Sequence, residues 1–411
     1  MMSLRYILLL CLCIAGILYS ANGVGEDWPA YRHDIHRSGV TSEALPVASL
    51  KKVWEYRAPR PPQQAWHGPA KWDAFSGKNN LRSMRNYDPV FFTVAAGNDV
   101  FFGSSVEDAV FCLNAETGAQ KWNYVTGGSV RMAPMLADGK LYAGSDDGAA
   151  YCLDAATGAL IWTYRPSEER YLPNDGKLIS RWPVRSGVLV DGGTAYFGAG
   201  LFPWAEAYLC AVDAASGKPE GEGRYRKALQ GVTIEGALLA SRECLYVPQG
   251  REAPMVFRRN DGADLGTVKD AGGVFALITP ENQLVFGAPD QKDNFIAVRD
   301  SANSEALASY PEGICMVVHD ERAYVLRDNE LLALNRKDGS TAWSVACDCP
   351  YALILAGDML FTGGNNKVDA FSVIDGASLT SLKVSGRAYG ITVANTRLFI
   401  STDTGGVVCF R

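Results

Sequence analysis

Residues 133–162 read APMLADGKLYAGSDDGAAYCLDAATGALIW, and this stretch decides the fold. Three turn signals, Asp138-Gly139, Asp146-Asp147-Gly148 and Ala156-Thr157-Gly158, divide it into four short apolar runs. Runs of this length between glycine-containing turns are typical of antiparallel β-strands. No part of the stretch carries a helical period of useful length. The stretch is therefore predicted to form a four-stranded antiparallel sheet.

The second strand of this unit recurs along the chain, each time as an aromatic residue followed by a small or apolar one. The pattern occurs eight times, mostly 38 to 54 residues apart. The aromatic positions are Phe102, Tyr142, Tyr196, Tyr246, Phe286, Tyr324, Phe361 and Phe399. A period near 40 residues with four strands per unit is the signature of a β-propeller, and a solenoid or a pair of sandwiches is the alternative.

The two ends of the chain complete one unit together. After Phe399 the chain runs through Val407 to Phe410 and stops at Arg411, one strand short of a full unit. Residues 53–56 resemble residues 121–124 and supply the missing outer strand. A strand shared in this way closes the ring and leaves no open edge. We predict an all-β fold over residues 51–411, an eight-bladed β-propeller of four-stranded blades, closed by an N-terminal strand that completes the last blade.

The N-terminus has the features of a targeting segment. Arg5 precedes an apolar run from Ile7 to Leu18, and small residues follow at Ala21 and Gly23. The run is shorter than the ~20 residues of an ordinary membrane span. Residues 1–23 are predicted to be a cleaved signal peptide, with an uncleaved anchor as the alternative. Residues 24–50 then form a lead segment, and the protein is expected to be exported, periplasmic or extracellular, without a membrane span after cleavage.

The composition is that of an ordinary soluble globular protein. The chain has 39 Lys and Arg residues against 45 Asp and Glu residues, a net charge of -6, and 47% hydrophobic residues. Nucleic-acid binding normally needs a concentrated basic face, so the mild acidity argues against a nucleic-acid partner. We expect a monomer.

Four insertions interrupt the regular units at residues 57–89, 166–183, 200–206 and 248–254. Each joins either a second strand to a third or one blade to the next. In a propeller these connections lie on one face, around the mouth of the central channel. Loops on a rigid scaffold are where binding residues concentrate, so this face is the predicted binding surface.

Arginines and aromatic residues mark that surface, because arginine bonds carboxylates or sulfates and aromatic rings offer flat stacking faces. Arg131, Arg185 and Glu235 occupy the same position in three successive units, at the start of the innermost strand. The alternative for these three is that they bond one another between blades, and for Trp182 and Trp204 that they pack within loops. The predicted ligand-binding residues are Arg82, Arg85, Tyr87, Arg131, Arg181, Trp182, Arg185, Trp204, Glu235 and Arg387.

The unit resembles the pyrroloquinoline-quinone (PQQ) repeat. Residues 153–158 (Leu-Asp-Ala-Ala-Thr-Gly) followed by Trp162, and residues 113–118 followed by Trp122, carry the resemblance. The opening residues 27–32 also look like the start of exported bacterial proteins of this group. The resemblance implies the propeller fold. It leaves the function open, since the superfamily holds quinone-dependent alcohol dehydrogenases, the barrel-assembly propeller lipoprotein of the bacterial outer membrane and many exported proteins without assigned activity.

The quinone-dependent enzymes resemble one another in having adjacent cysteines beside the cofactor, and this chain has no Cys-Cys pair. It has Cys347-Asp348-Cys349 instead, a spacing that suits a strained disulfide or a soft-metal site and makes these two cysteines the thiol candidates. We find no catalytic set, no metal site and no assembled calcium ligands in the sequence. We therefore expect no cofactor, with PQQ plus calcium as the alternative.

These observations predict an exported, non-catalytic binding or scaffold propeller that recognises a protein, peptide or glycan on its loop-rich face. The first alternative is a PQQ-dependent oxidoreductase with a divergent cofactor site. The second is a factor in outer-membrane protein assembly.

Overall fold

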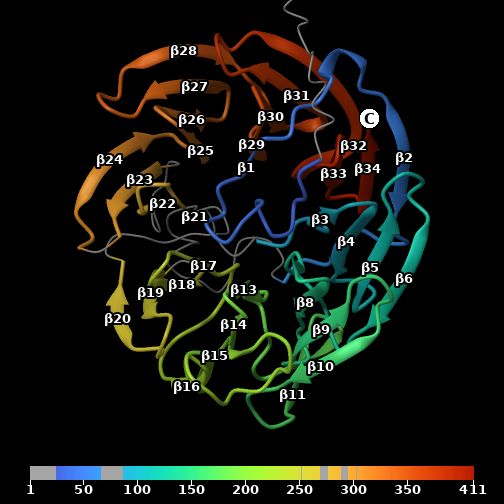
Figure 1. Cartoon of the computed structure of the whole chain (residues 1–411), viewed down its shortest axis with the longest axis vertical. Coiled ribbons are helices and arrows are strands. Elements are labelled where there is room, and N and C mark those ends of the chain that lie inside the picture. The colour runs from blue at the N-terminus through green and yellow to red at the C-terminus, as the bar shows by residue number, and fades with distance from the viewer. Residues whose placement is uncertain (1–24, 66–86, 251, 269–275, 288–294, 302) are drawn as a thin grey trace, which may run out of the picture.

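The computed structural model describes residues 25–65, 87–250, 252–268, 276–287, 295–301 and 303–411. The predicted signal peptide, residues 1–23, lies outside this part of the chain. The described residues are almost entirely strand and turn, with a single 3-10 turn at η1 (Val47–Ser49). Figure 1 shows the strands as small sheets arranged in a ring around a centre. The predicted all-β propeller fold is confirmed.

Within the described residues there are six four-stranded sheets, and each is an antiparallel meander in chain order. They are β3–β6 (Thr93–Ala96, Asp99–Ser104, Ala109–Asn114 and Gln120–Val125), β7–β10 (Met135–Ala137, Lys140–Gly144, Ala150–Asp154 and Leu160–Tyr164), β13–β16 (Leu189–Asp191, Thr194–Ala199, Ala207–Asp213 and Tyr225–Leu229), β17–β20 (Leu239–Ala240, Cys244–Gln249, Glu252–Arg258 and Asp264–Thr267), β21–β24 (Ala276–Ile278, Gln283–Gly287, Phe295–Asp300 and Ala306–Pro311) and β25–β28 (Cys315–His319, Arg322–Leu326, Glu330–Asn335 and Thr341–Ala346).

A further sheet of eight strands joins the two ends of the chain. In order across the sheet its strands are β1 (Val40–Thr41), β29 (Ala352–Ala356), β30 (Met359–Gly363), β31 (Asn365–Ser372), β32 (Ser378–Ala394), β33 (Arg397–Thr402), β34 (Gly406–Phe410) and β2 (Lys52–Arg57). Strand β2 pairs antiparallel with β34, with Trp54 opposite Cys409, so the predicted closure of the ring is present (Figure 1). The long strand β32 contributes to both halves of this sheet. The predicted number of eight blades requires each half to be taken as one blade, and that number stays an interpretation.

The tryptophan and glycine of the repeat are complementary parts of one contact between blades. The Trp122 indole on β6 donates to Ala155 O at 3.1 Å, in the next blade. A Cβ added at Gly158 would lie 2.6 Å from the Trp122 ring, and Gly158 has a φ of +74°. Only glycine tolerates both conditions. The same contact occurs for Trp54 on Gly118, Trp162 on Gly217 and Trp343 on Gly376.

The lead segment crosses the centre of the ring and hydrogen-bonds with the innermost strands of five sheets (Figure 1). Each contact lies near the end of the innermost strand, beside the turn to the second strand. The backbone bonds are Trp28 N to Ala95 O (2.8 Å), Leu136 N to Pro29 O (2.8 Å), Ala240 N to Ile35 O (3.0 Å), Ile278 N to His36 O (2.9 Å) and Leu355 N to Gly39 O (2.8 Å). The lead segment therefore covers the channel on the face of the first-to-second-strand turns.

The opposite face, which carries the second-to-third-strand connections, is called the loop face below. A two-stranded hairpin, β11 (Tyr171–Asn174) and β12 (Lys177–Ser180), lies on it within the predicted insertion 166–183. The Lys177 ammonium donates to Ser105 O at 2.9 Å, in the β4–β5 connection. Gln63, from the predicted insertion 57–89, donates to Asp175 Oδ2 at 2.8 Å. These contacts put parts of two insertions side by side on the loop face.

Candidate functional site

Arg131, Arg185 and Asp146 form the centre of a buried charge cluster on the loop face. Arg131 and Arg185 begin the inner parts of two successive blades, and Asp146 lies in the β8–β9 connection between them. Arg131 Nε donates to Asp146 Oδ2 at 2.7 Å, and Arg185 Nε donates to Asp146 Oδ1 at 2.9 Å. A second bond runs from Arg185 Nη2 to Asp146 Oδ2 at 3.1 Å. Both arginines are buried, and they share one carboxylate.

Two further carboxylates extend the cluster. Asp88 Oδ2 accepts a bond from Arg131 Nη1 at 2.8 Å, and Glu235 Oε1 lies 3.9 Å from Arg185 Nη1. Burial raises the pKa of Asp88 above its ordinary value, in spite of the opposing charge of Arg131. Burial also acts to raise the pKa of Asp146, but the two arginines outweigh it and hold the pKa below its usual range. Tyr87 is buried beside this cluster, and its burial raises its pKa.

The structure thus brings together Tyr87, Arg131, Arg185 and Glu235, as the shared position of three of them in the repeat suggests. The main partners of the two arginines are Asp146 and Asp88, and of the mutual bonds that the alternative interpretation describes the structure shows the Arg185–Glu235 ion pair at 3.9 Å. Their role in ligand binding stays a prediction. Arg82 and Arg85 lie outside the described residues.

Trp182 and Trp204 have opposite environments on the loop face. Trp182 is buried, and its indole donates to Glu206 O at 2.7 Å. This bond ties the base of the β11–β12 hairpin to the insertion 200–206. Trp204 is 76% exposed and lies against Phe202, with ring centroids 5.1 Å apart. Arg181 lies over the Trp182 ring, with its guanidinium carbon 5.4 Å from the centroid.

The hairpin adds exposed apolar side chains to the loop face, since Tyr171 is 41% and Leu178 64% exposed. We call Tyr171, Leu178, Phe202 and Trp204 the apolar patch. Exposed apolar side chains on the loops of a rigid scaffold are candidates for interaction sites. Trp204 is among the predicted ligand-binding residues, whereas Tyr171 and Leu178 are not, because hairpin formation within residues 166–183 was not predicted.

Arg387 lies in a different place, on β32 at the last blade. Its Nε donates to Asp403 Oδ2 at 2.8 Å, and about half of its side chain is exposed. The neighbouring Tyr389 ring contacts Tyr351, with centroids 4.7 Å apart. These two tyrosines face the centre of the ring, where they border a cavity.

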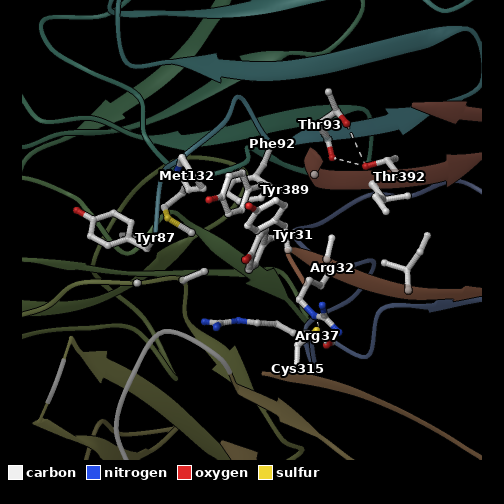
Figure 2. Close-up of a pocket in the computed structure, with 18 of the residues that line it drawn as sticks. Tyr31, Arg32, Arg37, Tyr87, Phe92, Thr93, Met132, Cys315, Tyr389 and Thr392 are labelled. Carbon is white, nitrogen blue, oxygen red and sulfur yellow. Dashed lines mark hydrogen bonds between the residues drawn. The ribbon is translucent and has the colours of Figure 1, made fainter. Parts of the chain in front are cut away.

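The cavity of about 330 Å³ lies between the lead segment and the innermost strands. Figure 2 shows Tyr31, Phe92 and Tyr389 gathered in the middle of the view, with Arg32 and Arg37 below them. Sequence reasoning missed these residues, apart from placing Tyr31 and Arg32 in a segment that resembles related proteins. The available signal was the density of arginine and aromatic residues in the lead segment, but nothing in the sequence places that segment inside the channel.

The described lining of the cavity contains no carboxylate and no carboxamide side chain. Calcium takes carboxylate and carbonyl oxygens as ligands, so this lining does not match the calcium set of a quinone-dependent enzyme. We derive no step through PQQ from these residues. Among the residues that the structure describes, no helix is long and apolar enough to span a membrane.

Cys347 and Cys349 lie between β28 and β29, and both are buried thiols. Cys347 Sγ lies 3.6 Å from Thr362 Oγ1, and Cys349 Sγ lies 3.3 Å from Asp369 Oδ2. A hydrogen bond from Cys349 lowers the pKa of Cys347 to about 7, against the opposing effect of burial. Their role as a thiol site stays a prediction.

One group of possible metal ligands is present among the described residues. Ligand atoms of Asp348, Cys349 and Asp369 lie within 4.8 Å of one another. The Lys367 ammonium donates to Asp348 at 2.5 Å and to Asp369 at 2.8 Å. A protein cation therefore already lies between the two carboxylates.

Solved structures share the fold at low sequence identity. A europium-containing methanol dehydrogenase is 12% identical with a TM-score of 0.63, over 91% of this chain and 89% of that chain. A quinohemoprotein alcohol dehydrogenase from Pseudomonas putida is 12% identical with a TM-score of 0.64, over 94% and 80% of the two chains. The computationally designed Ika8 protein is 13% identical with a TM-score of 0.61, over 79% and 97%. These likenesses support the propeller fold and carry no statement about activity.

A search among curated proteins gives no match. A family model does match, over residues 51–307 and 262–411, and these two ranges together cover the whole predicted propeller. The chain therefore belongs to the PQQ-repeat family described as outer membrane protein assembly factor BamB.

Proposed function

We propose that this chain is an exported, non-catalytic binding propeller that contacts a protein partner through the apolar patch of its loop face. The observation that carries the proposal is the exposure of Trp204 (76%) and Leu178 (64%) on two insertions that Trp182 joins. Tryptophan and tyrosine are enriched in the energetic centres of protein interfaces. A patch held by a buried tryptophan is also preorganised, which lowers the ordering cost of binding.

The family description supports a role in outer-membrane protein assembly as the setting of this contact. In that setting the protein works in the periplasm, and its partner is a protein rather than a glycan. The propeller supplies a rigid frame, and the insertions supply the recognition surface.

Photo-crosslinking in the envelope fraction of the source cell tests the proposal. A benzophenone side chain at position 204 is expected to crosslink to a component that handles outer-membrane proteins. Position 374 is the control, because Ile374 is 81% exposed but lies in the third-to-fourth-strand connection β31–β32, on the face opposite the loop face. Crosslinking of the same partner with equal yield from both positions would contradict a partner surface at the patch.

Genetic complementation gives a second, independent measurement. Deletion of the gene is expected to produce an envelope defect that the wild-type chain restores and the double variant Trp204→Ala, Leu178→Glu does not. A double variant that folds and restores the envelope as well as the wild type would exclude the patch as the functional surface.

The oxidoreductase alternative is tested by adding PQQ and calcium to the purified protein. A ligand that binds only the folded state raises the melting temperature by mass action. A saturable rise together with dye-linked oxidation of alcohols would favour the enzyme over the binding module. No rise is expected, because the described cavity lining offers no carboxylate or carboxamide for calcium.

A further inference from the structure

Arg37 is a buried cation that borders the central cavity. Its side chain is 2% exposed, and its Nε donates to Leu238 O at 3.1 Å. Its Nη2 atom has no hydrogen-bond partner among the described residues. The contacts that the structure shows for this guanidinium are thus a neutral carbonyl and the ring of Tyr31, whose centroid is 5.7 Å away.

The surroundings of Arg37 destabilise its positive charge, so an anion bound beside it would be favourable. Burial is the main cause that lowers the pKa of Arg37 to about 9; Tyr31 acts to raise this pKa, and the nearby positive charge of Arg32 acts to lower it. Arg32 itself donates to backbone carbonyl oxygens of Arg37 (3.2 Å), Leu353 (3.3 Å) and Met316 (3.3 Å). A buried ionised group is costly unless it is paired with an opposite charge.

The cavity beside these arginines provides no negative charge of its own. Among its described lining residues, the charged side chains are Arg32 and Arg37, and carboxylates are absent. The Arg131 and Arg185 cluster differs in this respect, because Asp146 and Asp88 neutralise it. An anion that enters the cavity would therefore meet the positive charge of Arg37, for which the described residues show no carboxylate partner.

The remaining walls are aromatic. Tyr31 and Phe92 pack edge to face with centroids 5.0 Å apart (Figure 2). The ring centroids of Tyr351 and Tyr389 lie 4.7 Å apart. A hydroxyl pair, Thr93 Oγ1 to Thr392 Oγ1 at 3.0 Å, also borders the cavity. Aromatic walls stack on flat apolar groups and do not favour a fully hydrated inorganic ion.

We propose that the central cavity binds a small organic carboxylate with an aromatic or other flat apolar body. The carboxylate lies at Arg37, where the guanidinium donates paired hydrogen bonds, and the flat body lies among Tyr31, Phe92, Tyr351 and Tyr389. The volume of about 330 Å³ suits a one-ring compound. This site is separate from the apolar patch, so either assignment can fail without the other.

Calorimetric titration of the purified full chain with benzoate and benzamide tests the proposal. The two probes have the same ring and nearly the same shape, but only benzoate is charged. Benzoate is expected to bind saturably and to raise the melting temperature, with benzamide at least about tenfold weaker. Equal affinity for the two probes would overturn the proposal, as would sulfate binding as tightly as benzoate, which indicates an anion site without an aromatic subsite.

Variants locate the binding. Arg37→Met is expected to weaken benzoate binding by about tenfold or more and to leave benzamide binding unchanged. Arg57→Gln is the matched control, because Arg57 is an exposed arginine on β2. Benzoate affinity that is unchanged in Arg37→Met would overturn the assignment.

If Arg37→Met does not fold, Arg37→Lys carries the same comparison. Lysine keeps the charge and loses the planar fork, so benzoate binding is expected to weaken while the preference over benzamide persists. The variant Tyr389→Leu tests the aromatic walls independently, and it is expected to weaken benzoate more than acetate. An equal loss for benzoate and acetate would contradict a flat body among the tyrosines.

Discussion

Arg185 holds Asp146 across a blade boundary, with its Nε 2.9 Å from Oδ1 and its Nη2 3.1 Å from Oδ2. Arg131, from the blade of Asp146 itself, bonds the same carboxylate at 2.7 Å. One buried carboxylate thus joins two arginines that start successive inner strands. A ligand that used either arginine would have to compete with Asp146, so this cluster contributes first to the arrangement of the blades.

The variant Asp146→Asn is expected to destabilise the protein by about 3–5 kcal/mol, because it leaves two buried arginines without their shared charge. Urea unfolding measures this free energy. Arg258→Gln is the control, since Arg258 and Asp261 form an exposed ion pair at 2.8 Å, worth about 0–1 kcal/mol. A loss below about 1 kcal/mol in Asp146→Asn would show that the cluster does not stabilise the fold.

The comparison of the wild type with Asp146→Asn should also depend on pH, because Asp146 contributes to stability only while it is charged. The two arginines, in spite of burial, hold the pKa of Asp146 below its ordinary value, so its charge stabilises the folded state above the unfolded pKa of about 3.9. This contribution is lost as the pH falls through the lower, folded-state pKa. The difference in unfolding free energy between wild type and Asp146→Asn should be constant near neutral pH and shrink below about pH 4. A constant difference down to the lowest pH at which both proteins fold would contradict the assignment.

Gly158→Ala tests the tryptophan contact of the repeat. An added Cβ would lie 2.6 Å from the Trp122 ring at a φ of +74°, whereas at Gly139 (φ +70°) it would meet nothing within 4 Å. Both variants bear the left-handed backbone penalty of about 1–2 kcal/mol. Gly158→Ala should cost about 1–3 kcal/mol more because the packed indole must move. Thermal and urea unfolding of both variants compare them, and equal losses would mean that the indole moves freely.

The sequence predicts the fold well because the residues that make the contacts between blades recur at fixed positions in the repeat. Trp122 and Gly158 recur in register since each blade must dock on the next, and Trp54 closes the ring by the same contact with Gly118. The site is less predictable. Arg131, Arg185 and Glu235 share a position in the repeat, which suggested that they lie together. Asp146 appears in the sequence as part of a turn, and only the blade-to-blade geometry reveals it as their partner.

The lead segment shows the limit of pattern-based prediction. Arg37 and Tyr31 belong to no repeat, and the course of residues 28–41 across the ring follows from backbone bonds to strands up to about 320 residues away in sequence, such as Leu355 N to Gly39 O. Periodicity carries no information about such contacts. The central cavity was therefore not predicted, and the binding site was expected on the loop face instead.

Trp182 and Trp204 separate the stability of the loop face from its recognition. Trp182→Ala is expected to cost about 3–5 kcal/mol, because the buried indole and its bond to Glu206 O are lost. Trp204→Ala should change stability by no more than about 0.5 kcal/mol, since that side chain is 76% exposed. Partner crosslinking should be weakened more by Trp204→Ala than by Trp182→Ala when equal amounts of folded protein are compared. A large loss of stability in Trp204→Ala would assign that residue to loop packing instead.

Cys347 is expected to be the most acidic thiol among the described cysteines whose pKa values are shifted. The hydrogen bond from Cys349 lowers its pKa to about 7, opposed by burial and assisted by Thr362, whereas burial raises the pKa of Cys152 to about 11. Ultraviolet absorbance should therefore show a thiolate step near pH 7. The step should disappear in Cys347→Ser and remain in the control Cys152→Ser.

Cys349→Ala provides the mechanistic part of this test, because it removes the hydrogen-bond donor and keeps the Cys347 thiol. The step is then expected to move upward, toward or beyond the ordinary cysteine value of about 8.5, since burial now acts with less opposition. A step that stays near pH 7 in Cys349→Ala would mean that Cys349 does not stabilise the thiolate. In that case the low pKa would come from the Thr362 hydroxyl, 3.6 Å from the sulfur, and from the backbone N–H of residue 349, which the variant keeps. Thr362→Val would then be the variant expected to raise the pKa of Cys347.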